Sequence, residues 1–250
     1  MHRSILWGFH PVYEALRAER REITAIEMVL EKIRPRDEAL ITLARRRGVA
    51  VKGTSAQQLT AKVGHKRHQG ICAFVSEYPY SSLDAIVERA GIDQNAPFVL
   101  VLDQIVDPQN FGAIVRTAHC AGVHGIVVAK HHSAPPSAAA SKASAGALEH
   151  MPVACASNLV DVLKRLKSEG VWIAGADQAG AQMVFDADLS GPLAIVVGAE
   201  EKGIRPLVKK MCDYLVAVPQ AGAIGSLNAS AAAAVVLYEA FRQRRTSVSK

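Results

Sequence analysis

Five short apolar runs in the second part of the chain constrain its fold most strongly. Each is continuous and rich in Val, Ile, Leu or Ala; in order they read FVLVLDQI, GIVVAK, VWIAGAD, LAIVVGAE and YLVAVP. Continuous runs of this length are typical of strands that are buried on both faces. Segments with helical periodicity alternate with them, namely FGAIVRTAHCAG, NLVDVLKRLKSEG, IRPLVKKM and SLNASAAAAVVLYEAFRQRR. We therefore predict an α/β domain over residues 97–250, with a mostly parallel sheet flanked by helices.

The first third of the chain has a separate pattern and a separate charge. HPVYEALRAER and RDEALITLARRRG predict helices, and ITAIEMVL and GICAFVSEY predict strands, which together make a small α/β unit. Residues 1–78 hold 14 Lys and Arg against 8 Asp and Glu, whereas the remaining residues hold 15 of each. A basic module suits a polyanionic partner, although a basic surface kept for solubility has the same charge. We place this module at residues 1–78 and a linker, with a helix in SLDAIVERA, at residues 79–96.

Composition argues against several other classes of protein. No apolar run is long enough to cross a bilayer, and the first residues, MHRSILWGFHPVYEAL, lack the apolar segment of a secretory signal. We therefore expect a cytoplasmic protein without a membrane partner. The four cysteines are widely spaced without a zinc-ligand pattern, and the adjacent His131 and His132 would point to opposite faces of a strand. No metal site is expected.

Unusual polar residues follow three of the predicted strands. VDPQNFGAIVRTAHCAG follows the first strand, EKGIRP the fourth and QAGAIGSLN the fifth. Ligands of parallel sheets bind at the carboxyl ends of the strands, so these three exits predict one site. The site is not of a standard nucleotide type, because the chain has no G-x-G-x-x-G, and GAEEKGIR lacks the Lys-Ser or Lys-Thr of a phosphate-binding loop. These absences argue against an ordinary doubly wound nucleotide enzyme.

Each polar residue at these exits also has a purely structural explanation. Asn110, Ser226 and Asn228 are residue types that commonly cap helices. Arg116 is harder to explain in this way, because it interrupts an apolar helix in which a buried guanidinium would need acceptors. Glu200, at the end of a very apolar strand, raises the same question with the opposite charge.

Three ordered motifs resemble those of the SPOUT-class, TrmH-type RNA ribose 2′-O-methyltransferases. They read DPQNFGAIVRTAHCAGV, LAIVVGAEEKGIRP and VAVPQAGAIGSLNASAAAAVVLYE, and SKASAGALEHMPV between them resembles the family's Ser/Ala/Gly loop. In the first third, GFHPVYEALRA and HQGICAFVSEYPY resemble the small RNA-binding domain, similar to ribosomal protein L30e, of bacterial enzymes that modify a guanosine of 23S rRNA.

This resemblance implies transfer of a methyl group from S-adenosylmethionine to the ribose 2′-hydroxyl of a guanosine in 23S rRNA. It also implies a homodimer and a deep trefoil knot in the second domain, whereas general topology rules alone predict an unknotted sheet. Two alternatives remain: methylation of tRNA, and a non-catalytic RNA-binding protein. The basic first domain with its HQG stretch favours ribosomal RNA, and the three complete motifs favour catalysis.

The resemblance also implies the residues of the site. The catalytic set comprises Asn110, Arg116, Glu200, Ser226 and Asn228. The cofactor is held through the backbone at Gly198, Val218 and Leu227, with Gly203, Pro219 and Gly222 shaping the loops. One residue departs from the pattern, because Glu201 stands where many relatives have glycine.

A guanidinium is rarely deprotonated in proteins, which makes Arg116 a poor general base. We expect Arg116 to stabilise negative charge developing on the ribose oxygen and to bind the adjacent phosphate, which relays the proton. Ser226 and Asn228 are expected to cap the last helix while they present polar groups to the substrate, with Leu227 beside the cofactor.

Overall fold

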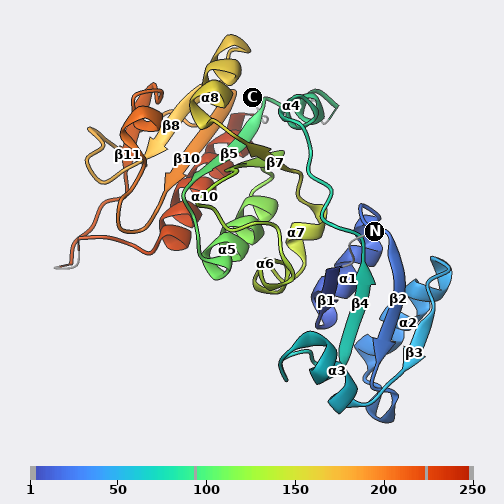
Figure 1. Cartoon of the computed structure of the whole chain (residues 1–250). Coiled ribbons are helices and arrows are strands. Elements are labelled where there is room, and N and C mark those ends of the chain that lie inside the picture. The colour runs from blue at the N-terminus through green and yellow to red at the C-terminus, as the bar shows by residue number, and fades with distance from the viewer. Residues whose placement is uncertain (1–3, 93–94, 223–224, 248–250) are drawn as a thin grey trace. The chain divides into compact units, whose positions relative to one another are not determined.

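The computed structural model describes residues 4–92, 95–222 and 225–247 and divides into two compact units (Figure 1). The first unit comprises Met1–Pro79 with Pro136–His150, and the second comprises Tyr80–Pro135 with Met151–Lys250. Two crossings of the chain therefore connect the units in the middle of the sequence, in addition to the one near residue 79.

The described part of the first unit contains a four-stranded sheet in the order β1-β4-β2-β3. β4 pairs antiparallel with both β1 and β2, while β3 pairs parallel with β2 at the far edge. The strands are β1 Ser4–Trp7, β2 Ile23–Met28, β3 Val51–Gly53 and β4 Ile71–Val75, and the helices are α1 Phe9–Ala18, η1 Leu30–Lys32, α2 Pro35–Arg46 and α3 Ala56–Val63.

The helix α1 shows how the apolar spacing builds the core of this unit. Phe9, Val12 and Leu16 are buried at intervals of three and four residues, which puts them on one face of the helix. They pack with the inner side chains of the sheet, such as Leu6 and Ile26. Burying an aliphatic side chain of this size stabilises the fold by about 1.5–3 kcal/mol.

The segment Pro136–His150 packs on the first unit although it lies between two strands of the second. Its helices, α6 Ala138–Ala143 and α7 Ala147–His150, contact α1, and α6 also contacts β1. Gly146 has φ +87, and a Cβ there would lie 2.8 Å from the carbonyl oxygen of His10, so only glycine fits. The buried Glu149 carboxylate accepts a hydrogen bond from Ser141 Oγ (2.8 Å) and lies 3.6 Å from the Arg21 guanidinium.

The second unit confirms the predicted α/β fold with a parallel sheet. In the described residues the sheet has seven strands in the order β7-β6-β5-β10-β8-β11-β9, and every pairing is parallel. The short outer strands β7 and β9 were not among the five predicted runs. The strands are β5 Phe98–Asp103, β6 Gly125–Ala129, β7 Val153–Ala156, β8 Trp172–Ala176, β9 Gln182–Met183, β10 Leu193–Gly198 and β11 Tyr214–Ala217.

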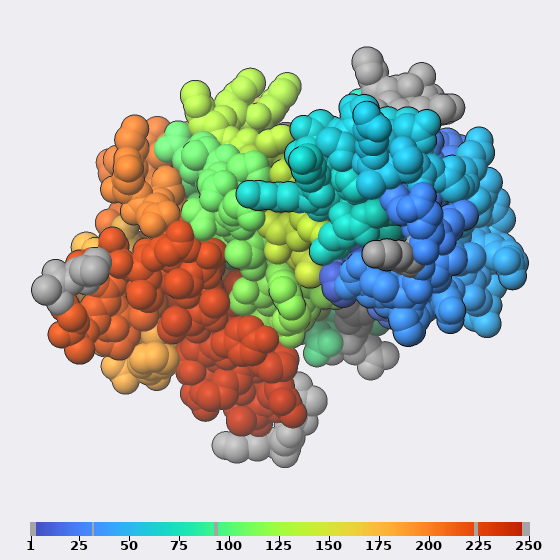
Figure 2. Space-filling model, turned by 90° about the horizontal axis from the view of Figure 1, so that it is seen from below, coloured from blue at the N-terminus to red at the C-terminus, as the bar shows by residue number. Residues whose placement is uncertain are grey.

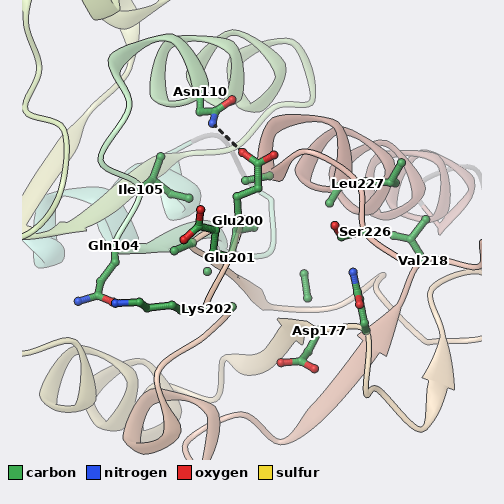
Figure 3. Close-up of a pocket in the computed structure, with 18 of the residues that line it drawn as sticks. Gln104, Ile105, Asn110, Asp177, Glu200, Glu201, Lys202, Val218, Ser226 and Leu227 are labelled. Atoms are coloured by element: carbon green, nitrogen blue, oxygen red, sulfur yellow. Dashed lines mark hydrogen bonds between the residues drawn. The ribbon is translucent and has the colours of Figure 1, made fainter. Parts of the chain in front are cut away.

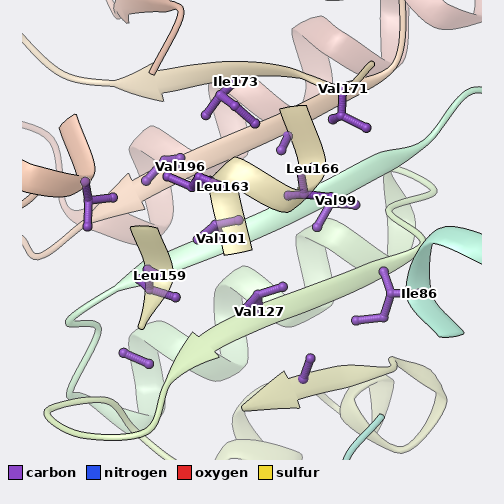
Figure 4. Close-up of a cluster of buried hydrophobic side chains, with 14 of the residues drawn as sticks. Ile86, Val99, Val101, Val127, Leu159, Leu163, Leu166, Val171, Ile173 and Val196 are labelled. Carbon is purple, nitrogen blue, oxygen red and sulfur yellow. The ribbon is translucent and has the colours of Figure 1, made fainter. Parts of the chain in front are cut away.

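The main buried cluster of the second unit lies between helices and one face of this sheet (Figure 4). Leu159, Leu163 and Leu166 project from α8 onto strand residues that include Val101 and Val196. Elsewhere in the unit α5 and α10 pack against each other, and α10 contacts β8 and β10. The helices are α4 Leu83–Ile92, α5 Pro108–Cys120, α8 Leu159–Ser168, α9 Pro206–Lys209 and α10 Ala229–Ser247.

The register of the sheet brings the strand exits to one edge. Gly198 at the end of β10 pairs with Asp103 at the end of β5, and Ala176 at the end of β8 pairs with Val197. The predicted polar exits are therefore neighbours in space. Among the described helices, none is both long and apolar enough to cross a membrane. The trefoil knot and the L30e-like character of the first unit stay predictions.

Candidate functional site

A cavity of about 1470 Å³ lies at the carboxyl edge of the second unit's sheet (Figure 3). Its walls come from the loops after β5, β8, β10 and β11 and from the start of α10. Seven of the eleven predicted site residues line it: Asn110, Gly198, Glu200, Gly203, Val218, Ser226 and Leu227.

The loop after β10 forms one wall, and two glycines give it its shape. Ala199 and Gly203 exchange backbone hydrogen bonds of 3.1 and 2.8 Å, which close a tight turn. Gly203 has φ +62, and a Cβ at Gly198 would overlap the backbone of Gly203. Glycine is therefore required on both sides of the turn, and the residues between them, Glu200, Glu201 and Lys202, are held at the cavity.

A buried carboxylate fastens the far end of this loop. Asp103, fully buried at the end of β5, accepts hydrogen bonds from Arg205 N at 2.9 Å and from Arg205 Nε at 2.7 Å. The two contacts tie the residue that follows the loop to the neighbouring strand. This pair was not predicted from the sequence, although an aspartate at the end of a fully apolar strand is a visible signal.

Three polar side chains, one from each sequence motif, meet at the cavity. Asn228 Nδ2 lies 3.0 Å from Asn110 Oδ1 and 3.2 Å from Glu200 Oε2. Asn110 Nδ2 also donates to Glu200 Oε2, at 3.5 Å (Figure 3). The side chain of Asp107 caps α5 by accepting hydrogen bonds from the backbone N–H groups of Gln109 and Asn110, which fixes Asn110 in the first helical turn.

Asn228 combines a structural contact with its place in this cluster. Its Oδ1 accepts a hydrogen bond from Ser230 N at 2.9 Å, while its Nδ2 faces Asn110 and Glu200. The helix α10 begins one residue later, at Ala229. The sequence predicts that Ser226 and Asn228 both cap this helix; the structure confirms this for Asn228. Ser226 is exposed and lines the cavity.

The structure does not bring the other predicted residues into the cavity wall. Pro219 and Gly222 are exposed in the loop after β11, outside the lining residues. Arg116 lies on α5 with an exposed side chain and forms no ion pair with another described residue. The burial that the apolar helix suggested for Arg116 is wrong, because the helix turns this position toward solvent.

A fourth strand exit, after β8, contributes Asp177, and the exit after β5 adds Gln104; neither residue was predicted as part of the site. Asp177 follows β8, lines the cavity and forms an ion pair with Lys209 Nζ at 2.7 Å. Gln104 follows β5 with φ +64, a conformation uncommon for a residue other than glycine. The signal for Asp177 was the ending of VWIAGAD, which places a carboxylate after an apolar run just as LAIVVGAE does.

The arrangement suits a ligand that is partly apolar and also carries charged groups. Ile105, Val218 and Leu227 give apolar wall, and Glu200 and Glu201 add carboxylates beside Lys202, while Asp177 is paired with Lys209. Within the described residues, no cluster of His, Cys, Asp and Glu is placed to hold a metal ion.

Two protein-family models match the chain. Residues 97–238 match the SpoU rRNA Methylase family, and residues 5–81 match the RNA 2′-O ribose methyltransferase substrate binding family. Together the two matches include the cavity residues and most of the first unit.

Individual proteins are similar over nearly the whole chain. A 23S rRNA (guanosine-2′-O-)-methyltransferase RlmB of Shewanella oneidensis is 37% identical over 247 residues, covering 98% of this chain and 99% of the relative. A putative TrmH family tRNA/rRNA methyltransferase of Bacillus subtilis is 37% identical over 237 residues, covering 95% and 94%. The crystal structure of the SpoU methyltransferase AviRb from Streptomyces viridochromogenes, in complex with the cofactor AdoMet, superposes with a TM-score of 0.81 at 26% identity, covering 98% of this chain and 91% of that one.

Proposed function

Because the chain belongs to the SpoU rRNA methylase family, we propose that it transfers a methyl group from S-adenosylmethionine to the ribose 2′-hydroxyl of a guanosine in 23S rRNA. The observation that carries this proposal is the contact of Asn110, Glu200 and Asn228, which come from three separate motifs and meet at one sheet edge. The substrate follows from the relatives named as 23S rRNA enzymes and from the substrate-binding match in residues 5–81.

The residues around the cavity fit S-adenosylmethionine. Ile105 and Leu227 offer apolar surface for the adenine, and Glu201 offers a carboxylate for the cationic groups. Val218 lies just beyond β11, where backbone N–H and C=O groups are not committed to a strand ladder. When bound there, the cofactor supplies a methyl group activated by a positively charged sulfur.

The polar side chains align the ribose and manage its charge. Asn110 and Asn228 hold each other and Glu200 in fixed positions, which suits them to orient a hydroxyl group for in-line attack. Arg116 lies outside the cavity wall of its own chain, and the resemblance assigns it to stabilise the developing oxyanion and the neighbouring phosphate, which relays the proton. Replacement of Arg116 by Ala is expected to lower turnover sharply and to leave cofactor affinity nearly unchanged; equal losses in both would contradict this role.

A homodimer formed through α5 and α10 completes the proposal. Tyr238 on α10 is 49% exposed and Leu227, just before α10, is 38% exposed, so both leave apolar surface that a partner could cover. The orange-red side chains of α10 form a continuous part of the second unit's surface in Figure 2. Since α5 packs against α10, the exposed Arg116 would face the partner in such a dimer rather than water.

The division into a substrate-binding domain (1–78), a linker (79–96) and a methyltransferase domain (97–250) belongs to the same proposal. We also infer a cytoplasmic location, because the proposed substrate is ribosomal RNA.

The experiment that tests the function uses S-adenosylmethionine with a labelled methyl group. Separated 23S rRNA, 16S rRNA and tRNA are incubated with the protein and then digested to nucleosides, with Asn110→Ala as the control. Label recovered as 2′-O-methylguanosine from 23S rRNA is the expected result. Label in tRNA would show that the proposed substrate is wrong and the proposed reaction is right. RNA binding without methyl transfer would contradict the proposed enzymatic activity.

A further inference from the structure

Lys142, on α6, lies in the first unit over the start of α1. Its Nζ is so close to Gly8 that a Cβ at this glycine would overlap it, and Gln69 Oε1 would lie 3.1 Å from the same Cβ. Gln69 Oε1 also accepts a hydrogen bond from Phe9 N, at 3.1 Å. A lysine from the segment between β6 and β7 thus meets side chains from the N-terminal part of the chain.

Lys142, Arg34 and Arg36 lie around this point, and the carboxylate of Asp37 contacts two of them. Arg34 donates to the carbonyl oxygen of Gln69 at 3.2 Å, and the guanidinium of Arg36 lies 5.2 Å from the centre of the Phe9 ring. The Asp37 carboxylate is 2.7 Å from Arg34 Nε and 3.8 Å from Arg36 Nε. It is therefore already engaged by two arginines.

Lys142 itself has no ion pair with a described residue and is half-buried. Burial, and then the positive charge of Arg36, lower the pKa of Lys142. A lysine held in this way is stabilised in its charged form when an anion comes within reach. Lys142 lies against Gly8 and Arg36 over the ring of the next residue, Phe9, so both cations lie beside the start of α1.

The loop Gly64–Gly70, at the same end of the unit, adds basic and aromatic side chains of the kinds that bind RNA. It carries Lys66 and Arg67, and the ring of His65 meets the ring of Trp7 edge-on with centroids 4.8 Å apart. Gln69 of the same loop is the residue that contacts Gly8 and Phe9. Cations interleaved with aromatic rings are typical of surfaces that bind single-stranded nucleic acid.

We propose that Lys142 and Arg36 together bind one phosphate of the RNA backbone, so that the segment between β6 and β7 takes part in substrate binding by the first unit. The arginine offers a planar pair of N–H donors and the lysine a point charge, and both suit phosphate oxygens. This inference rests on the proposed function, because RNA is the polyanion that the family's substrate-binding unit would meet.

The test measures RNA binding without cofactor, using a transcript of 23S rRNA and a series of salt concentrations. Lys142→Ala is expected to raise the Kd about threefold to tenfold. It should also make the negative slope of log K against log salt shallower by about 1, because one phosphate contact is lost. Lys142→Arg keeps the charge and should bind nearly as the parent does. The matched control is Lys52→Ala, which removes an exposed lysine from β3, at the opposite edge of the sheet from β1.

A double variant tests whether the two cations share one phosphate. If they do, Arg36→Ala combined with Lys142→Ala weakens binding less than the product of the two single effects. Unchanged affinity and slope for Lys142→Ala, an equal loss for Lys52→Ala, or fully multiplicative effects in the double variant would each overturn the proposal. Thermal melting checks the fold, and Lys142→Gln, which keeps most of the side-chain stem, repeats the test if Lys142→Ala unfolds.

A parallel methyl-transfer assay with the same transcript and S-adenosylmethionine distinguishes failure of the proposed function from failure of the phosphate site. If the protein binds the transcript through Lys142 but transfers no methyl group, the proposed methyltransferase activity is wrong and the proposed phosphate site is supported. If the protein methylates the transcript and Lys142→Ala does not change the KM for that RNA, the proposed phosphate site is wrong and the proposed activity is supported.

Discussion

Asp103→Asn tests whether the loop that carries Glu200 depends on a buried carboxylate. Asp103 is fully buried and accepts two hydrogen bonds from Arg205, at 2.9 and 2.7 Å. The asparagine has the same shape but only one acceptor oxygen, so its NH2 group faces one of the two donors. A hydrogen bond to a charged group contributes about 1.5–3 kcal/mol, and breaking a fully buried ion pair costs about 3–5 kcal/mol.

The structure favours the lower part of this range. The side chain of Arg205 is 43% exposed, so water can solvate it after the change. We therefore expect the free energy of unfolding to fall by about 2–3 kcal/mol, measured by urea denaturation at pH 7. Since the loop lines the cavity, the Kd for S-adenosylmethionine, measured by calorimetry, should rise at the same time.

The matched control is Asp84→Asn, which breaks a surface pair with Arg165. That pair spans 3.5 Å between side chains that are 65% and 59% exposed, so its loss should cost less than about 1 kcal/mol. A loss in Asp103→Asn no larger than in Asp84→Asn, with unchanged cofactor affinity, would refute the claim that Asp103 positions the loop.

Three further predictions concern residues of the two units. Gly198→Ala should weaken S-adenosylmethionine binding and lower the melting temperature, because the added methyl group overlaps the backbone of Gly203; a variant that melts and binds as the parent does would contradict this. Asn228→Ala should lower the free energy of unfolding by about 1 kcal/mol, because the hydrogen bond from Ser230 N is lost. Asn228→Asp keeps that acceptor, so in parallel melting and turnover assays it should lose more activity than stability. Burial, and then the charge of His65, lower the pKa of His68 below its ordinary 6.5, so the unfolded chain binds the proton more tightly than the folded chain does. The contribution of His68 to stability should therefore be complete above about pH 6.5 and decrease as the pH falls toward the folded pKa. His68→Gln should make the urea midpoint depend less on pH between about pH 5 and 7.5.

The local pattern of the sequence predicted the sheet of the second unit well, because each inner strand is a continuous apolar run. FVLVLD and LAIVVG became the adjacent strands β5 and β10. The outer strands β7 and β9 were missed because four and two residues are too few to show a period. The meeting of Asn110, Glu200 and Asn228 followed from the rule that parallel strands end at one edge.

Contacts between distant parts of the chain were not predictable in the same way. Nothing in the periodicity of SKASAGALEH shows that α6 and α7 pack on α1, since these contacts join residues more than a hundred positions apart, as the Glu149–Arg21 pair does. The exposure of Arg116 was also missed, because an apolar helix fixes which residues are apolar but not which side a single polar residue faces. Helical phase would have helped, since Arg116 is not in step with the buried Phe111, Ile114 and Val115.

The rate of a single methyl transfer tests most directly whether the Asn110–Glu200–Asn228 cluster is the reaction site. It would be measured with 23S rRNA and saturating S-adenosylmethionine for the parent, Asn110→Ala, Asn228→Ala and the double variant. Each single change should lower the rate by about a hundredfold, because the substrate loses its alignment, and the double variant should be little slower than the slower single one, since the residues act as a unit. Single variants that transfer methyl groups within about twofold of the parent rate would contradict this site, because the reaction would then not depend on the cluster.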